Sequence, residues 1–222
     1  MSWGVVALVG GVVGLDATSF PQVMISRPLV AGTLTGWILG DPALGAALGA
    51  MHEIFSLAVL PVGASRYPEA GTASVAATAA LVSSAAAGTW SALLVALVFA
   101  LLWERVSGAS VVLYRRNIER LLLTSDGNPL SSGRLERRHT LTIALDFARA
   151  ALVTLLGALL GSGLVTWLAP RADLPADLIR SAIAIAAAAV LGGSLRVFGG
   201  WAERRRAFVL GAVAGCALLL IQ

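Results

Sequence analysis

The chain has 222 residues, of which 58% are hydrophobic and only 13% charged, and its mean hydropathy is +0.86. A soluble domain carries about 25% charged residues, so this composition excludes a soluble globular protein and predicts a single integral-membrane domain over residues 1–222. We expect an all-α, polytopic fold. The single cysteine, Cys216, excludes an intrachain disulfide and a thiolate metal cluster.

Seven apolar segments follow one another along the chain: 3–15, 27–40, 43–61, 72–103, 141–169, 179–198 and 206–221. A helix needs about 20 apolar residues to cross the hydrocarbon, so the first two segments are too short to cross squarely. The first also lacks a basic leader and a cleavage site, and we expect it to be retained rather than removed as a signal peptide. Segment 72–103 is too long for one straight crossing, which predicts a break near Gly88 or a strong tilt.

Glycine and proline interrupt the first half of the chain at four places: 14–21, 28, 40–42 and 61–71. Broken helices expose backbone polar groups, which are tolerated at membrane depth only beside protein or a water-filled cavity. Such interruptions therefore predict broken or re-entrant helices and a transporter's binding site. Pairs of glycines four residues apart predict closely packed helices: Gly32/Gly36, Gly45/Gly49, Gly157/Gly161 and Gly211/Gly215.

All the basic residues are arginines, and eleven of them stand in two groups: Arg105, Arg115, Arg116, Arg120, Arg134, Arg137 and Arg138, then Arg196, Arg204, Arg205 and Arg206. The positive-inside rule places both groups in the cytoplasm. We divide the domain into an N-terminal half (1–103), a cytoplasmic basic loop (104–140) and a C-terminal half (141–222). The loop reads as an amphipathic helix that lies on anionic lipid headgroups, with a docking surface for soluble partners as the alternative; nucleic acid is not required.

Glu53 is the strongest candidate for substrate contact, because it stands inside the apolar run GAAMHEIFSLAVLP. A charge at mid-bilayer costs at least about 2.5–3.5 kcal/mol unless it is paired or wetted, so this carboxylate needs hydroxyl donors or a cation. Hydroxyl groups of a substrate would satisfy it, and a permanent tie to Arg27 or to a helix start is the alternative. His52 points about 100° away on a helix, so it either faces a neighbouring helix or water, or contacts the ligand.

Three further candidates stand at the breaks in the N-terminal half. Arg27 precedes a proline at a helix start and could hold substrate oxygens or pair with Glu53 or Asp16. Asp16 and Gln22 flank the first break, where carboxylate and amide groups suit substrate hydroxyls but also cap helices and form turns. Asp41 fits a helix cap better than a ligand contact.

The strings GLDATSFPQV, MISRPLV, LGD and LPVGA, followed by the Pro68–Glu69 pair, resemble the membrane component IIC of the mannose-fructose-sorbose family of bacterial phosphotransferase permeases. The resemblance is dense over residues 14–71 and rests on hydropathy beyond residue 72. The chain departs from the family pattern at Glu69, where the family tends to have aspartate, and at His52, where it usually has an apolar residue.

This resemblance implies a division of labour in the bacterial cytoplasmic (inner) membrane. IIC supplies the sugar-binding path, a second membrane subunit, IID, completes the complex, and cytosolic IIA and IIB relay phosphate to the sugar. It also implies internal inverted repeats, for which 14–61 and 141–198 are the candidates, an elevator-type movement, and a trimer of IIC–IID pairs.

The residues offer no catalytic machinery of their own. We find no Gly-rich phosphate loop, no serine elbow and no metal-ligand cluster, so we expect no enzyme activity in the isolated chain, no cofactor and no metal. Two other classes of function remain open. One is a non-transporting IIC-like scaffold or sensor, and the other is a substrate-capture subunit of a different uptake system.

Overall fold

The protein is an all-α membrane protein, and its computed structural model describes residues 2–57, 68–122, 132–172, 174–197, 205–206, 208–211 and 213. Its principal elements are α1 (Trp3–Thr18), α2 (Pro28–Leu39), α3 (Pro42–Ser56), α4 (Ala70–Val82), α5 (Trp90–Leu122), α6 (Ser132–Leu168), the 3-10 turn η1 (Ala169–Arg171) and α7 (Ala176–Val197). Six of the predicted apolar segments correspond to these helices. Most of segment 206–221, including Cys216, lies outside the described residues.

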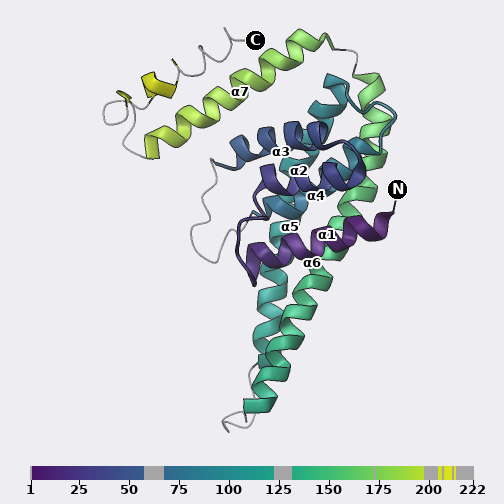
Figure 1. The fold of residues 1–222 in the computed structure, drawn as a ribbon, viewed down its shortest axis with the longest axis vertical. Helices are drawn as coiled ribbons and strands as arrows, with labels where there is room; N and C mark the ends of the chain where they lie inside the picture. The colour runs from purple at the N-terminus through teal and green to yellow at the C-terminus, as the bar shows by residue number, and fades with distance from the viewer. Residues whose placement is uncertain are drawn as a thin grey trace.

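The helices α5 and α6 form a long antiparallel pair that gives the molecule its axis (Figure 1). α1 and α4 pack against α6, and α2 packs against α3 and α4. In Figure 1 the short helices α1, α2 and α3 run across the direction of the long pair, and α7 crosses the top. The lower end of the pair projects beyond the other helices, and we call it the distal hairpin (residues 115–122 and 132–141).

Three of the described helices are long and apolar enough to cross a membrane: Trp90–Ile118, Leu135–Arg171 and Ala176–Ser194. The first two apolar segments form helices of only 16 and 12 residues, which confirms that they are too short to cross squarely. The predicted break in segment 72–103 is also confirmed. α4 ends at Val82, α5 begins at Trp90, and Gly88 between them has a φ of +84°, a value that glycine adopts without strain.

The predicted loop 104–140 has a different structure. Residues 104–122 continue the helix that begins at Trp90, and the chain is helical again from Ser132; residues 123–131 lie outside the described part. The 33 residues of α5 extend for about 50 Å at 1.5 Å per residue, longer than the ~30 Å hydrocarbon. The basic segment is therefore continuous with a candidate span rather than a separate helix, because no proline stands between Trp90 and Leu122 to end it.

α2 and α3 form a tight pair because glycine lines both sides of their contact. A Cβ added at Gly36 would lie 2.5 Å from the Asp41 carbonyl oxygen and 2.8 Å from the Cα of Gly45, so only glycine fits. Asp41 accepts a hydrogen bond of 2.9 Å from the backbone N–H of Leu44, which confirms it as the cap of α3. Glycine spacing thus predicts internal packing correctly here.

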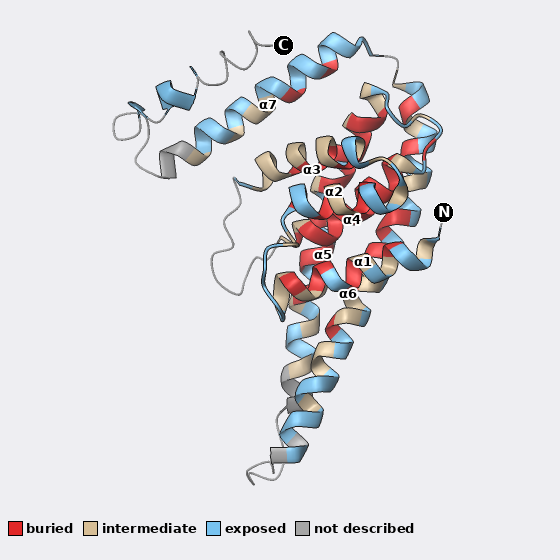
Figure 2. Ribbon diagram, viewed as in Figure 1, coloured by how far each residue is buried: buried red, intermediate tan, exposed pale blue. Residues whose placement is uncertain are grey.

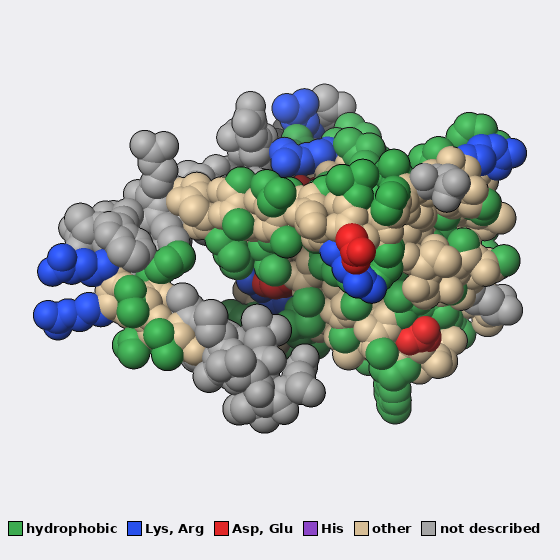
Figure 3. Space-filling view, turned by 90° about the horizontal axis from the view of Figure 1, so that it is seen from above, with side chains coloured by type: hydrophobic (Ala, Val, Ile, Leu, Met, Phe, Trp, Pro, Cys, Tyr) green, Lys and Arg blue, Asp and Glu red, His purple; other side chains and the backbone are tan. Residues whose placement is uncertain are grey.

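The core surrounds α4, in which every residue from Gly71 to Leu81 is buried (Figure 2). Large buried side chains around it include Leu48 and Leu81, and the rings of Phe99 and Trp103 stack 5.5 Å apart. α7 contributes Ile179 and Ile183 to the core but is otherwise largely exposed. Hydrophobic side chains spread over the surface seen from the upper end in Figure 3, as expected of a protein whose surroundings are lipid.

Candidate functional site

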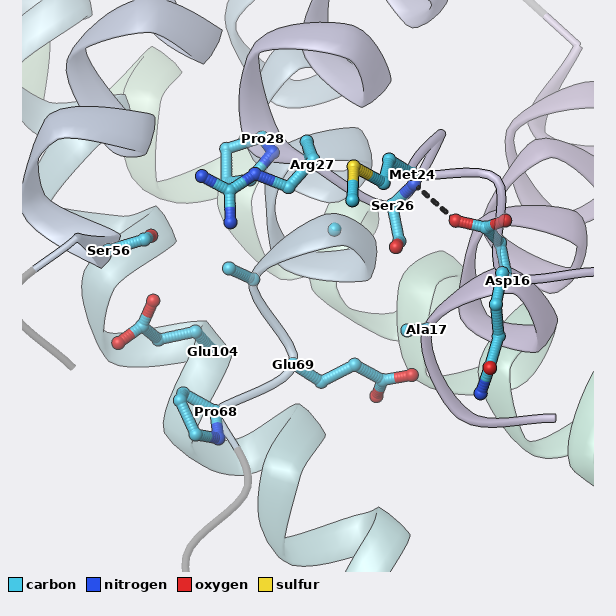
Figure 4. Close-up of a pocket in the computed structure, with 13 residues that line it drawn as sticks. Asp16, Ala17, Met24, Ser26, Arg27, Pro28, Ser56, Pro68, Glu69 and Glu104 are labelled. Atoms are coloured by element: carbon cyan, nitrogen blue, oxygen red, sulfur yellow. Dashed lines mark hydrogen bonds between the residues drawn. The ribbon is translucent and has the colours of Figure 1, made fainter. Parts of the chain in front are cut away.

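A cavity of about 330 Å³, lined by both charged and apolar residues, lies where α1, α2, α3, α4 and α5 meet. It is bordered by the irregular segment 19–27 and by the ends of four short helices. Three of the four predicted interruptions, 14–21, 28 and 61–71, contribute residues to its lining, and 40–42 does not. Figure 4 shows the residues that line it: Asp16, Ala17, Gln22, Met24, Ser26, Arg27, Pro28, Ser56, Pro68, Glu69, Ala70, Gly71 and Glu104. Of the five predicted site residues, Asp16, Gln22 and Arg27 line this cavity, and Glu53 and His52 do not.

Asp16 organises the irregular segment at the cavity edge. Its side chain accepts hydrogen bonds from the backbone N–H groups of Val23, at 2.6 Å, and Ser26, at 2.9 Å. Irregular backbone inside a membrane protein needs such partners, since lipid offers none. Gln22 and Met24 have positive φ values of 60° and 68°, so this carboxylate holds a tightly turned segment in place. Asp16 is thus a turn former and a cavity-lining carboxylate at once.

The ion pair between Arg27 and Glu53 joins the start of α2 to α3. Glu53 also accepts a hydrogen bond of 3.3 Å from the backbone N–H of Leu29, in the first turn of α2. The two contacts predicted for Glu53 as the alternative to sugar binding, an ion pair with Arg27 and a hydrogen bond at a helix start, are therefore both present. The Arg27 side chain is 50% exposed and lines the cavity, whereas Glu53 is 16% exposed and stands behind it.

The largest buried charge network among the described residues was not predicted and centres on Arg149 of α6. Its two terminal nitrogens each lie 2.9 Å from one carboxylate oxygen of the cavity residue Glu69. Its Nε donates to Asp146 at 2.8 Å, and Nη1 donates to Ser110 at 2.7 Å. Glu69 and Asp146 have side chains that are 0% exposed, so this arginine supplies charge and hydrogen bonds where water cannot.

Asp146 connects that network to the end of α1. It accepts hydrogen bonds from Thr18 and from Ser19, the latter at 2.6 Å. A sequence signal existed, because Asp146 and Arg149 are charged residues three apart inside an apolar run and share a helix face. The mean hydropathy of segment 141–169 is high despite Asp146 and Arg149, so these two charges were not recognised as a predicted site.

His52 reaches the cavity wall from behind. Its Nε2 lies 3.1 Å from Oε2 of Glu104, a lining residue from α5, and its side chain is 0% exposed. The expectation that it faces a neighbouring helix is confirmed, and it does not itself line the cavity. Glu104 was not predicted as a site residue, because it is the first residue of the segment 104–140 that was assigned to the basic loop.

The close contact between the cavity floor and segment 19–27 depends on Gly71. A Cβ at this position would lie 2.5 Å from the backbone oxygen of Ser26. At the same level, a Cβ on Gly14 would lie 2.2 Å from the Cβ of Ala150. Gly71 therefore lets segment 19–27 contact α4 directly, and Gly14 lets α1 contact α6 directly.

The cavity lining offers both acceptors and donors of hydrogen bonds. Asp16, Glu69 and Glu104 supply oxygen acceptors, and Arg27 and Gln22 supply N–H donors. In Figure 4 the Glu104 and Glu69 carboxyl groups point to opposite sides, with Arg27 above them. Among the described residues, no group of three or more His, Cys, Asp or Glu side chains is arranged to hold a metal ion.

Comparison with known proteins gives one family and one fold. The family described as the PTS system sorbose-specific IIC component matches residues 1–200. A PTS system sorbose-specific EIIC component from Lacticaseibacillus casei is 36% identical over 67 residues, a match that spans 30% of this chain and 24% of that relative's length. A solved structure described as "Structure of membrane protein" is similar with a TM-score of 0.74 and 19% identity, covering 99% of this chain and 91% of that one, which supports the fold alone. Since the family match extends over most of the 222 residues, the chain belongs to the family of sorbose-specific IIC membrane components of the phosphotransferase system.

Proposed function

We propose that this chain is the sugar-translocating IIC subunit of a mannose-type phosphotransferase system, and that it binds a hexose-like sugar in the cavity at the broken helices. It then passes the sugar to cytosolic IIB for phosphorylation. Family membership supports the class of function. The choice of this cavity rests on its position and chemistry.

The observation that carries the proposal is the coincidence of polar lining and interrupted helices in one cavity. Ligand pockets occupy about 300–1,000 Å³, and the volume of about 330 Å³ suits a small molecule such as a monosaccharide. The lining carboxylates are each held by partners: Asp16 by backbone N–H groups, Glu69 by Arg149 and Glu104 by His52. Acceptors fixed in this way lose little freedom when a sugar binds.

The remaining parts of the proposal concern the setting of the cavity. We place the chain in the bacterial inner membrane as one domain over residues 1–222, with the distal hairpin in the cytoplasm, because positive charge gathers on cytoplasmic segments. IID would complete the path, IIA and IIB would supply phosphate, and the pairs would assemble as a trimer. Elevator-type movement and inverted repeats belong to this proposal as well.

Equilibrium binding of L-sorbose, D-fructose and D-mannose to the chain purified with IID tests the site. Asp16→Asn removes a cavity charge, and Asp41→Asn makes the same change at a helix cap outside the cavity. We expect the Asp16 variant to bind at least tenfold more weakly, which corresponds to about 1.4 kcal/mol, and the Asp41 variant to bind normally. Equal effects of the two changes would exclude this cavity, and the lack of saturable binding by the wild type would favour a non-transporting scaffold or sensor.

A transport assay tests the division of labour. The chain alone in liposomes should show no saturable sugar uptake, because it has no phosphate donor and only part of the path. Adding IID and phosphorylated IIB should produce sugar phosphate on the IIB side. Robust flux through the lone chain would point to an independent carrier.

A further inference from the structure

His52 occupies a fixed position directly behind one wall of the cavity. Its backbone oxygen accepts a hydrogen bond of 2.9 Å from Ser56, which lines the cavity, and its ring contacts Glu104, which also lines it. Figure 4 shows Ser56 and Glu104 together on the side opposite Asp16. One buried residue of α3 thus contacts two groups of the same wall, from two different helices.

The hydrogen-bond pattern defines which ring nitrogen of His52 carries the proton. A carboxylate oxygen accepts, so the nitrogen that faces Glu104 at 3.1 Å, Nε2, is the donor. Nδ1 is buried and has no hydrogen-bond partner in the described part of the chain.

Glu104 is held from two sides and still has capacity to accept. Oε2 receives the His52 hydrogen bond, and Oε1 lies 3.3 Å from Nε of Arg105, whose side chain is 61% exposed. Each carboxylate oxygen can accept about two hydrogen bonds, so with respect to the described residues each retains one lone-pair direction. The carboxylate is oriented before any ligand arrives, and its free acceptor positions are those of a cavity-lining group.

A purely structural role for His52 makes a different prediction. If the ring only satisfied a buried charge, its loss would lower stability but would not change sugar affinity in the molecules that remain folded. If it orients an acceptor that the sugar uses, affinity falls, and it falls only when Glu104 is able to accept. The two roles therefore separate in a double-mutant cycle.

We propose that His52 is a positioning residue for sugar binding, which holds the Glu104 carboxylate where it accepts hydroxyl hydrogen bonds from the sugar. This inference rests on the proposed function of the cavity. It assigns roles to His52 and Glu104, which are 52 positions apart in the chain and are joined by a hydrogen bond.

The test measures binding of L-sorbose, D-fructose and D-mannose to the full chain purified with IID. His52→Gln places an amide N–H near the position of Nε2, and the shorter His52→Asn ends near Nδ1, so the two variants differ in reach but share a chemical group. We expect the Asn variant to bind at least tenfold more weakly and the Gln variant to stay within threefold of the wild type. In a Glu104→Gln background, which should itself bind at least tenfold more weakly, the Asn change should add less than threefold.

Thermal unfolding of each variant identifies the folded samples, and His52→Leu replaces the Asn variant if the latter does not fold. Equal affinities for the Gln and Asn variants, or full additivity with Glu104→Gln, would overturn the positioning role while leaving the cavity as the sugar site. Absence of saturable binding by the wild type would overturn the proposed function and this inference together. These outcomes distinguish the two failures.

Discussion

Removing Arg149 should destabilise the protein more than any other single charge removal described above. In Arg149→Leu the bidentate contact with Glu69 is lost, and that carboxylate stays buried without a cation. Breaking a buried pair by removing one partner costs about 3–5 kcal/mol. Asp146 keeps hydrogen bonds from Thr18 and Ser19, so its loss of the same partner adds less than a second full penalty.

The assay is the free energy of unfolding in mixed micelles, followed by far-UV circular dichroism. The chain offers a matched control, because Asp146 with Arg149 and Asp177 with Arg180 are both pairs three residues apart on a helix, at 2.8 Å and 3.3 Å. The first pair is buried, and the Asp177 side chain is 92% exposed. Asp177→Asn should therefore change the free energy of unfolding by about 0–1 kcal/mol.

A conservative variant separates charge from geometry. Arg149→Lys keeps the positive charge but cannot donate two parallel hydrogen bonds to Glu69, so we expect a loss of about 1–3 kcal/mol, between the other two variants. If Arg149→Leu lowered the free energy of unfolding no more than Asp177→Asn does, the buried network would not stabilise the fold, and the reasoning from burial would be refuted.

Three further predictions address packing, the site and orientation. Gly36→Ala should lower the free energy of unfolding, because the added Cβ would meet backbone atoms of α3. The control, Gly133→Ala, has nothing within 4 Å of the added Cβ and should be neutral or stabilising by up to about 1 kcal/mol. Equal effects of the two changes would contradict the packing argument. Glu53→Gln keeps shape and removes the charge that holds the cavity-lining Arg27, so sugar affinity should fall at least tenfold. An unchanged affinity would show that the Arg27–Glu53 pair does not support sugar binding. A cysteine at position Ser132, with Cys216 changed to alanine, should resist membrane-impermeant thiol reagents in intact cells and react in inverted vesicles; labelling from outside would reverse the topology.

Features set by neighbouring residues could be predicted from the sequence. The break near Gly88, the Asp41 cap and the close approach at Gly36 depend on backbone freedom, hydrogen bonding and side-chain size within a few positions. Hydropathy located the helices for the same reason. It separated the predicted amphipathic helix from the span before it, because charged residues lower the mean hydropathy of a helix that extends beyond a span.

Contacts between distant residues could not be predicted, because sequence spacing does not say which helix faces meet. Glu69 and Arg149 are 80 positions apart, and His52 and Glu104 are 52 apart. Intramembrane charge could be recognised as needing a partner, and Glu53 was. Only the packing of α2 on α3 identifies Arg27 as a partner of Glu53.

The short helices explain how one small cavity can hold several charges. Each helix end or irregular segment brings a polar side chain to the cavity without a full crossing: Asp16 near the end of α1, Arg27 before α2 and Glu69 before α4. The long helices then supply the counter-charges and donors from behind, with Arg149 on α6 and Arg105 on α5. Arg149 and Arg105 do not line the cavity, so the charges of Glu69 and Glu104 are balanced from outside it.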